Sequence, residues 1–211
     1  MSMPEPIGEL VNSRKMELIK EINSLWKPVY PHLVKQIHEI YGRRNGTILE
    51  MGPFCGVLFA LQEEQIGDSF WMAVFPLGMK EAFQEEIERR EPENRVSLIE
   101  TDPFLNGVEE NRFDLVIFRG AFFFPSLFQV HLPKIDRILK PAGMAFIGGG
   151  FGKYTPETVI KEIGKKSREL NLAIGKVEMS EDRLKKEIAK SAITGSFEVT
   201  TDGGLWVVMR K

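Results

Sequence analysis

A short apolar strand that runs directly into a glycine turn constrains this chain more than any other feature. Residues 47–51 read Thr-Ile-Leu-Glu-Met, and Gly52 and Gly56 follow at the start of an apolar, helix-like run over 55–65. Strand, glycine turn and helix form the opening of a βαβ unit, in which the turn can approach a ligand closely and the helix directs N–H groups at it. The segment therefore predicts a ligand site at the carboxyl edge of a parallel sheet.

Strands and helices alternate along the rest of the chain. The apolar patterns predict strands at 47–51, 70–75, 96–100, 113–118 and 143–149, and helices near 55–65, 78–91, 126–139, 156–171 and 180–192. Residues 196–209 predict two further strands joined by the turn at Asp202, Gly203 and Gly204. Such alternation is typical of an α/β fold whose mostly parallel sheet is covered on both faces.

Two helices are predicted ahead of the first strand. Apolar residues recur at helical spacing over 8–26 and 31–41, and Pro28 and Pro31 mark the break between these runs. Gly42 is a suitable C-terminal stop for the second helix. We therefore expect an N-terminal helical cap of residues 1–44 ahead of a domain of residues 45–211.

Charge and cysteine content narrow the classes of function. The chain carries 28 basic and 30 acidic residues, with no basic run interleaved with aromatics, so no nucleic-acid partner is expected. No apolar run approaches the ~20 residues that a membrane span needs, and the N-terminus lacks a signal pattern. The single cysteine, Cys55, suits a cytoplasmic location, and the three histidines lack metal-site spacing, so no metal is expected.

Two downstream segments complete a family pattern. Residues 112–118 read Arg-Phe-Asp-Leu-Val-Ile-Phe, and residues 137–147 read Arg-Ile-Leu-Lys-Pro-Ala-Gly-Met-Ala-Phe-Ile. With the glycine turn, they make roughly residues 45–150 resemble the class I S-adenosylmethionine (SAM)-dependent methyltransferases. The resemblance implies the Rossmann-like methyltransferase fold: a doubly wound, seven-stranded, mostly parallel sheet, closed by a terminal hairpin whose last strand is antiparallel. It also implies SAM as the cofactor.

The resemblance assigns cofactor contacts to the strand ends. The family pattern is acid-x-Gly-x-Gly-x-Gly, and here Glu50 is the acid while Phe54 stands at the middle glycine. Glu50 is expected to hold the ammonium of the cofactor's amino-acid end, because a cation favours a nearby carboxylate. Asp102 is expected to accept a hydrogen bond from the adenine, with Phe104 against the ring, although both also suit an ordinary capped turn. The other expected contacts are Gly52, Pro53, Phe54, Gly56, Phe75, Pro76, Leu77, Pro103, Arg119 and Gly120.

The second strand departs from the family pattern. In the family this strand usually ends in an acid that binds both ribose hydroxyls, whereas residues 72–78 here read Met-Ala-Val-Phe-Pro-Leu-Gly. Two charge-assisted hydrogen bonds, each worth ~1.5–3 kcal/mol, would be missing. Either backbone groups replace them, or SAM binds weakly, or the site binds another molecule.

Aromatic residues follow the fourth and fifth strands, where a methyl acceptor would approach. Phe122, Phe123, Phe151 and Tyr154 are therefore predicted substrate contacts, although some of these rings also suit the core. Trp26 and Tyr30 are expected to form a lid or wall, with simple packing on the sheet as the alternative. No catalytic residue is assigned, because methyl transfer chiefly requires alignment and exclusion of water.

These features favour SAM-dependent methyl transfer to a small, apolar or aromatic acceptor. Two alternatives stay open: a catalytically inactive SAM- or nucleoside-binding protein, and a methyltransferase-fold scaffold for interactions. The sequence also leaves open a homodimer, the identity of the acceptor and the atom that is methylated.

Overall fold

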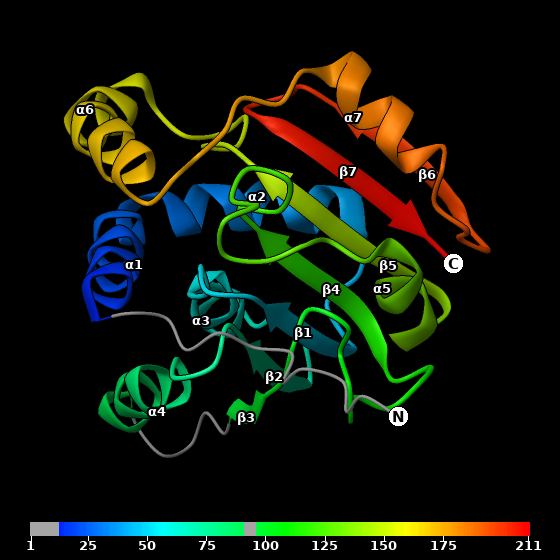
Figure 1. Cartoon of the computed structure of the whole chain (residues 1–211). Coiled ribbons are helices and arrows are strands. Elements are labelled where there is room, and N and C mark those ends of the chain that lie inside the picture. Colours follow the sequence, from blue (N-terminus) through cyan, green and yellow to red (C-terminus); the bar gives the residue numbers. More distant parts are fainter. Residues whose placement is uncertain (1–12, 91–95) are drawn as a thin grey trace, which may run out of the picture.

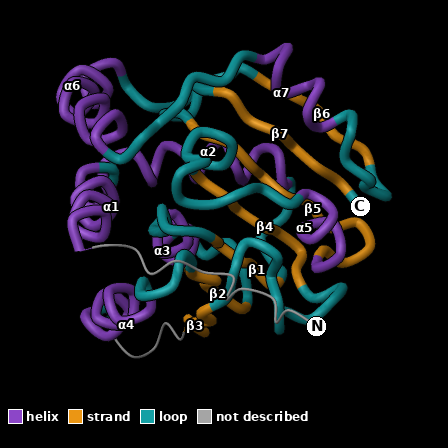
Figure 2. The backbone as a smooth tube through the Cα atoms, viewed as in Figure 1, coloured by secondary structure: helices purple, strands orange, loops and turns teal. Residues whose placement is uncertain are grey.

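The computed structural model describes residues 13–90 and 96–211 (Figure 1). The start of the predicted first helix and the last residue of the predicted 78–91 helix lie outside these residues. The described chain forms one seven-stranded sheet flanked by helices, and Figure 2 shows how loops join the strands to those helices at both edges of the sheet.

The sheet has the strand order β3-β2-β1-β4-β5-β7-β6. The strands are β1 (Thr47–Met51), β2 (Ser69–Val74), β3 (Val96–Glu100), β4 (Phe113–Arg119), β5 (Leu139–Gly149), β6 (Ser196–Thr200) and β7 (Leu205–Arg210). Strands β1 to β5 are parallel, and β7 runs antiparallel between β5 and β6. The predicted α/β sheet and its terminal hairpin are therefore confirmed. Strand order reverses between β1 and β4, which places a topological switch point at their carboxyl ends.

The helices are α1 (Ser13–Leu25), α2 (Tyr30–Tyr41), α3 (Val57–Glu63), α4 (Lys80–Arg89), α5 (Leu132–Ile138), α6 (Glu157–Ala173) and α7 (Glu181–Ile188), with a short 3₁₀ helix, η1 (Lys27–Val29). The break predicted at Pro28 is this 3₁₀ turn, and Gly42 ends α2 with a φ of 74°. Helix α1 packs beside α6, although the two are far apart in sequence (Figure 1). The division into a cap of residues 1–44 and a domain stays a prediction.

One predicted helix is much shorter than expected. The helical pattern over 126–139 yields a helix only at Leu132–Ile138, and the chain before it forms turns. The helix begins only where Pro133 can occupy its first turn. The apolar residues that resemble a helix face here belong instead to a loop that covers the carboxyl edge of the sheet.

Asp114 lies at the amino end of β4, on the side of the sheet opposite the switch point, and bonds to several neighbouring groups there. Its Oδ2 accepts hydrogen bonds from the backbone N–H of Thr47 at 2.8 Å and from Lys140 Nζ at 2.7 Å, and Arg43 lies 3.7 Å from Oδ1. Burial raises the pKa of this carboxyl, but the hydrogen bonds and the two cations outweigh burial and lower it overall. Asp114 thus has a structural role away from the switch point.

We expect Asp114→Asn to lower the free energy of unfolding by about 1 kcal/mol at pH 7. A carboxyl with a lowered native pKa contributes stability above its unfolded pKa and loses it as the pH falls through the native pKa. The difference between the wild type and the variant should therefore shrink as the pH falls below about 4 and vanish only below the native pKa. Urea unfolding at pH 7 and pH 3 measures this, and an equal difference at both values would contradict it.

Candidate functional site

The carboxylate of Glu50 is held by the helix that follows the glycine turn. Its two oxygens accept the backbone N–H groups of Gly56, Val57 and Leu58 at 2.8, 3.2 and 2.9 Å, and the side chain has no exposed surface. Burial raises the pKa of Glu50, while the charge of Arg119 and the three N–H groups oppose the rise. Glu50 therefore fixes the geometry of the turn itself, and its predicted contact with an ammonium stays a prediction.

Arg119, at the end of β4, connects the glycine turn to the N-terminal helices. Its Nε donates to the carbonyl of Phe54 at 3.0 Å and its Nη2 donates to the hydroxyl of Tyr30 at 3.2 Å. The guanidinium lies over the rings of Tyr30 and Trp26, at 4.7 and 5.1 Å from their centroids. Arg119 is 5% exposed, and its Nη1 makes no hydrogen bond within the described residues. The Nη1 group of a buried cation, with its two N–H donors, is thus available to a ligand.

Aromatic rings cover two glycines of the predicted cofactor site. A Cβ added at Gly52 would lie 2.8 Å from the ring of Phe118, and one added at Gly120 would lie 2.5 Å from the ring of Phe54. Phe118 belongs to a buried cluster with Phe75 and Phe128, whose ring centroids are 5.1–5.7 Å apart. These glycines therefore make room for the chain's own side chains.

The ends of β2 and β3 carry the remaining predicted cofactor residues. Phe75 is fully buried, Pro76 is half-buried and Leu77 is exposed. Asp102 accepts hydrogen bonds from the N–H of Phe104 and the amide of Asn106, so it caps its own turn. Pro103 lies in that turn and is half-buried, while the ring of Phe104 stacks on His131 with 4.0 Å between centroids.

One carboxylate at this edge was missed by sequence reasoning. Glu100 pairs in register with Val74, and its Oε1 accepts the N–H of Gly78 at 3.1 Å, so it lies beside the loop after β2. The sequence shows the acid at the end of β3, but not that it reaches across to the neighbouring strand.

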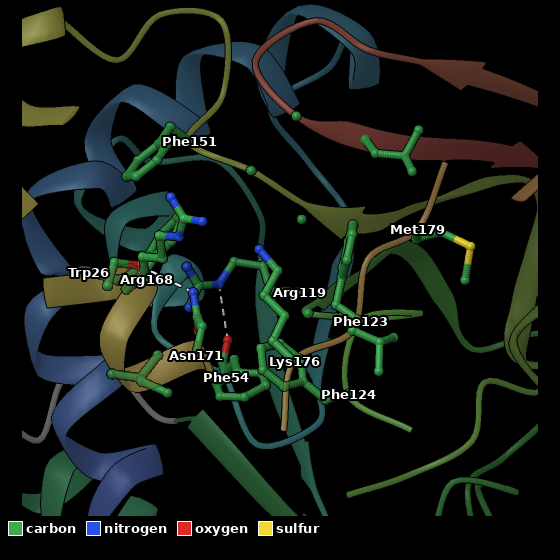
Figure 3. Close-up of a pocket in the computed structure, with 18 of the residues that line it drawn as sticks. Trp26, Phe54, Arg119, Phe123, Phe124, Phe151, Arg168, Asn171, Lys176 and Met179 are labelled. Carbon is green, nitrogen blue, oxygen red and sulfur yellow. Dashed lines mark hydrogen bonds between the residues drawn. The ribbon is translucent and has the colours of Figure 1, made fainter. Parts of the chain in front are cut away.

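A cavity of about 490 Å³ opens beyond the carboxyl ends of β4 and β5 and the amino end of β7 (Figure 3). It brings together six residues predicted from the sequence, namely Trp26, Phe54, Arg119, Gly120, Phe123 and Phe151. The rings of Trp26 and Phe151 stack with 4.8 Å between centroids and join α1 to the chain after β5. The cavity thus combines predicted cofactor residues with predicted substrate residues.

The other predicted substrate residues lie elsewhere. Tyr30 lines a smaller cavity of about 190 Å³, together with the predicted cofactor residue Gly56. The carbonyl of Pro53 accepts a hydrogen bond from Asn23, which lines the same cavity. Phe122 lines a separate cavity of about 230 Å³. Tyr154 is 44% exposed and donates its hydroxyl to Glu39.

Helix α6 supplies a wall of the main cavity that sequence reasoning missed. The residues concerned are Gly164, Ser167, Arg168, Asn171 and Leu172. Ser167 accepts the indole N–H of Trp26 at 3.0 Å and an amide N–H of Asn171 at 3.3 Å. These five positions follow the i, i+3, i+4, i+7, i+8 spacing of one helix face, which was the available signal.

The floor of the main cavity is backbone. Gly149 and Gly150 at the end of β5 and Gly204 at the start of β7 line it. A Cβ on Gly150 would clash with the backbone of Gly203 and Gly204, and one on Gly204 would clash with the carbonyl of Gly149. The two strands therefore approach too closely there for any side chain.

Comparison with known proteins supports the fold. No family model and no curated protein matches the chain. A candidate SAM-dependent methyltransferase from Methanococcus maripaludis is 24% identical, with a TM-score of 0.76 over 100% of this chain and 97% of that chain. A SAM-dependent methyltransferase from Aquifex aeolicus is 16% identical, with a TM-score of 0.59 over 91% and 96%. A protein named PigF, solved with SAH, is 14% identical, with a TM-score of 0.62 over 93% and 58%.

These likenesses show that the chain has the fold of the class I SAM-dependent methyltransferases, as its sequence predicts. The described helices include none with the length and apolar character that a membrane crossing demands.

Proposed function

We propose that this chain, with its class I methyltransferase fold, binds SAM at the carboxyl edge of β1 and β4 and transfers a methyl group to a small acceptor in the main cavity. One observation carries the proposal: Phe54, Arg119 and Gly120 belong to the predicted cofactor site and also line the cavity. Group transfer between two bound molecules requires adjoining sites, because the reacting atoms must approach within about 3–3.5 Å. The cavity volume also suits a small acceptor.

The residues suit the amino-acid end of SAM. Arg119 offers a buried donor to a carboxylate, and a charge-assisted hydrogen bond of that kind is among the stronger ones in proteins. At the nucleoside end, β2 provides no carboxylate, because residues 72–78 include neither Asp nor Glu. We assign the ribose contact to Glu100, whose carboxylate lies against the loop after β2.

The chain's own part in the reaction is to position and to exclude water. When bound, SAM supplies a methyl group on a positively charged sulfur. The stacked rings of Trp26 and Phe151 and the buried ring of Phe123 surround the acceptor space with apolar surface. Such walls align an acceptor and keep water from the reacting atoms.

Calorimetric titration with SAM and with adenosine tests both the site and the role of Glu100. We expect Glu100→Gln to weaken both ligands about 10- to 100-fold, because a charge-assisted hydrogen bond worth ~1.5–3 kcal/mol is lost while the amide oxygen still accepts the N–H of Gly78. Glu109→Gln is the matched control, since Glu109 is exposed and pairs only with Arg112. A folded wild-type protein that binds neither SAM nor SAH at millimolar concentration would contradict the proposal.

One observation favours a second candidate, a ligand-binding protein of this fold without methyl transfer. The rings of Phe118 and Phe54 lie against Gly52 and Gly120, where the cofactor is predicted to bind. Such a protein would still bind a small molecule in the main cavity. Ligand binding there without any SAM binding is the result that would support this candidate over the enzyme.

A further inference from the structure

The main cavity is lined by more cations than acids. Arg119, Arg168 and Lys176 line it, whereas Glu178 is the one acidic residue among the described lining residues. None of the three cations forms an ion pair within the described part of the chain. Figure 3 shows all three around the same space. An excess of positive charge around an apolar cavity favours a ligand of opposite charge.

The three cations are held differently. Arg119 is fixed by Phe54 and Tyr30 and keeps its Nη1 group free, as described above. The ammonium of Lys176 lies 5.2 Å from the centroid of the Phe123 ring, on the cavity wall. Burial of part of its side chain lowers the pKa of Lys176, so an anion placed beside it would relieve an existing electrostatic cost. Arg168 projects from α6 and is exposed.

The rest of the lining is apolar or aromatic. The rings of Trp26, Phe123, Phe124 and Phe151 and the side chains of Leu172 and Met179 form most of it. This surface suits a ring or a hydrocarbon chain, because burying apolar area is favourable by roughly 25 cal/mol per Å². The cavity therefore combines an apolar body with a cationic end.

We propose that the main cavity binds an apolar anion, either a carboxylic acid or a phosphate monoester carried on an aromatic or aliphatic body. The anionic group meets Arg168 and Lys176, and the body lies against the aromatic walls. Arg119 is left to the carboxylate of the proposed cofactor. The binding of this anion does not depend on the proposed function. Only its role as the methyl acceptor rests on the proposed function.

Calorimetry on the full-length chain without SAM tests the charge preference with three probes that share one ring system: 2-naphthoate, 2-naphthyl phosphate and the uncharged 2-naphthamide. We expect at least one anion to bind ten-fold or more tightly than the amide. Raising the salt concentration should weaken the anion and leave the amide unchanged. The tighter of the two anions identifies the head group.

Variants separate the cavity from general surface charge. Lys176→Gln combined with Arg168→Gln should weaken the preferred anion about ten-fold and leave 2-naphthamide unchanged. Both residues are exposed and unpaired, so the double variant should fold. Lys165→Gln is the control, because Lys165 is exposed on α6 but does not line the cavity.

Three results would overturn the proposal: equal affinity for the amide and both anions, an unaffected anion affinity in the double variant, or no binding of any probe at millimolar concentration. Failure of SAM to bind in the separate titration would remove methyl transfer and leave this result standing. Tight SAM binding with no preference for anions would overturn the anion proposal and leave the proposed methyl transfer standing.

Discussion

Phe75→Asp is expected to unfold the protein or to lower its free energy of unfolding by at least about 4 kcal/mol. The Phe75 ring is fully buried between Phe118 and Phe128, at 5.6 and 5.7 Å between centroids. Deleting a buried Phe ring costs about 3–5 kcal/mol, and a buried carboxylate without a partner adds to this. The loss is a large part of the 5–15 kcal/mol that stabilises an ordinary domain. Urea unfolding followed by circular dichroism measures it.

The same substitution at an exposed ring gives the control. Phe197 on β6 is 39% exposed, so Phe197→Asp should cost about 1 kcal/mol or less. A Phe75→Asp protein as stable as the wild type would mean that the ring cluster contributes little. A large loss of stability would mean that an acid for the ribose cannot be introduced at position 75. The ribose contact must then come from another residue, and Glu100 is the one we propose.

Arg119→Met is expected to cost about 3–5 kcal/mol, because it removes the cation that offsets the buried charge of Glu50. The substitution also leaves the carbonyl of Phe54 and the hydroxyl of Tyr30 without their donor. Methionine keeps a similar length of apolar side chain, so the loss reports mainly on charge and hydrogen bonding. Urea unfolding at pH 7 measures the change.

A double-mutant cycle separates the charge interaction from the rest. Glu50→Gln combined with Arg119→Met should cost at least about 1 kcal/mol less than the sum of the single variants, because the double variant buries no unpaired charge. Arg168→Met is the control, since Arg168 is exposed, and its effect should stay within about 0.5 kcal/mol. Strictly additive losses at positions 50 and 119 would contradict the electrostatic explanation.

The sheet was largely predictable because each of its strands has a strong local signal. Residues 47–51 and 96–100 match the predicted strands at both ends, since turn residues bound them. The predicted helix over 126–139 is confirmed only in its second half, because the apolar residues of its first half belong to a loop. Local spacing cannot distinguish a buried loop from a helix face.

The cavity was predictable only where it adjoins the strand ends. Arg119 and Gly120 follow β4 directly, so the parallel sheet places them at its carboxyl edge. Ser167 and Arg168 lie on a helix whose apolar face is visible in the sequence, but nothing local reveals that this helix packs beside α1. The hydrogen bonds from three backbone N–H groups to the Glu50 carboxylate likewise depend on where the chain turns. The residue types alone do not specify that turn.

The glycine floor of the cavity separates what can change in this protein from what cannot. At Gly150 and Gly204 a new side chain would force β5 and β7 apart, so that surface cannot be altered without disrupting the sheet. The facing wall on α6 includes exposed side chains, such as Arg168 and Leu172, that lie outside the sheet. Ligand choice could therefore diversify among descendants of this chain by mutation of one helix, while the fold is inherited intact.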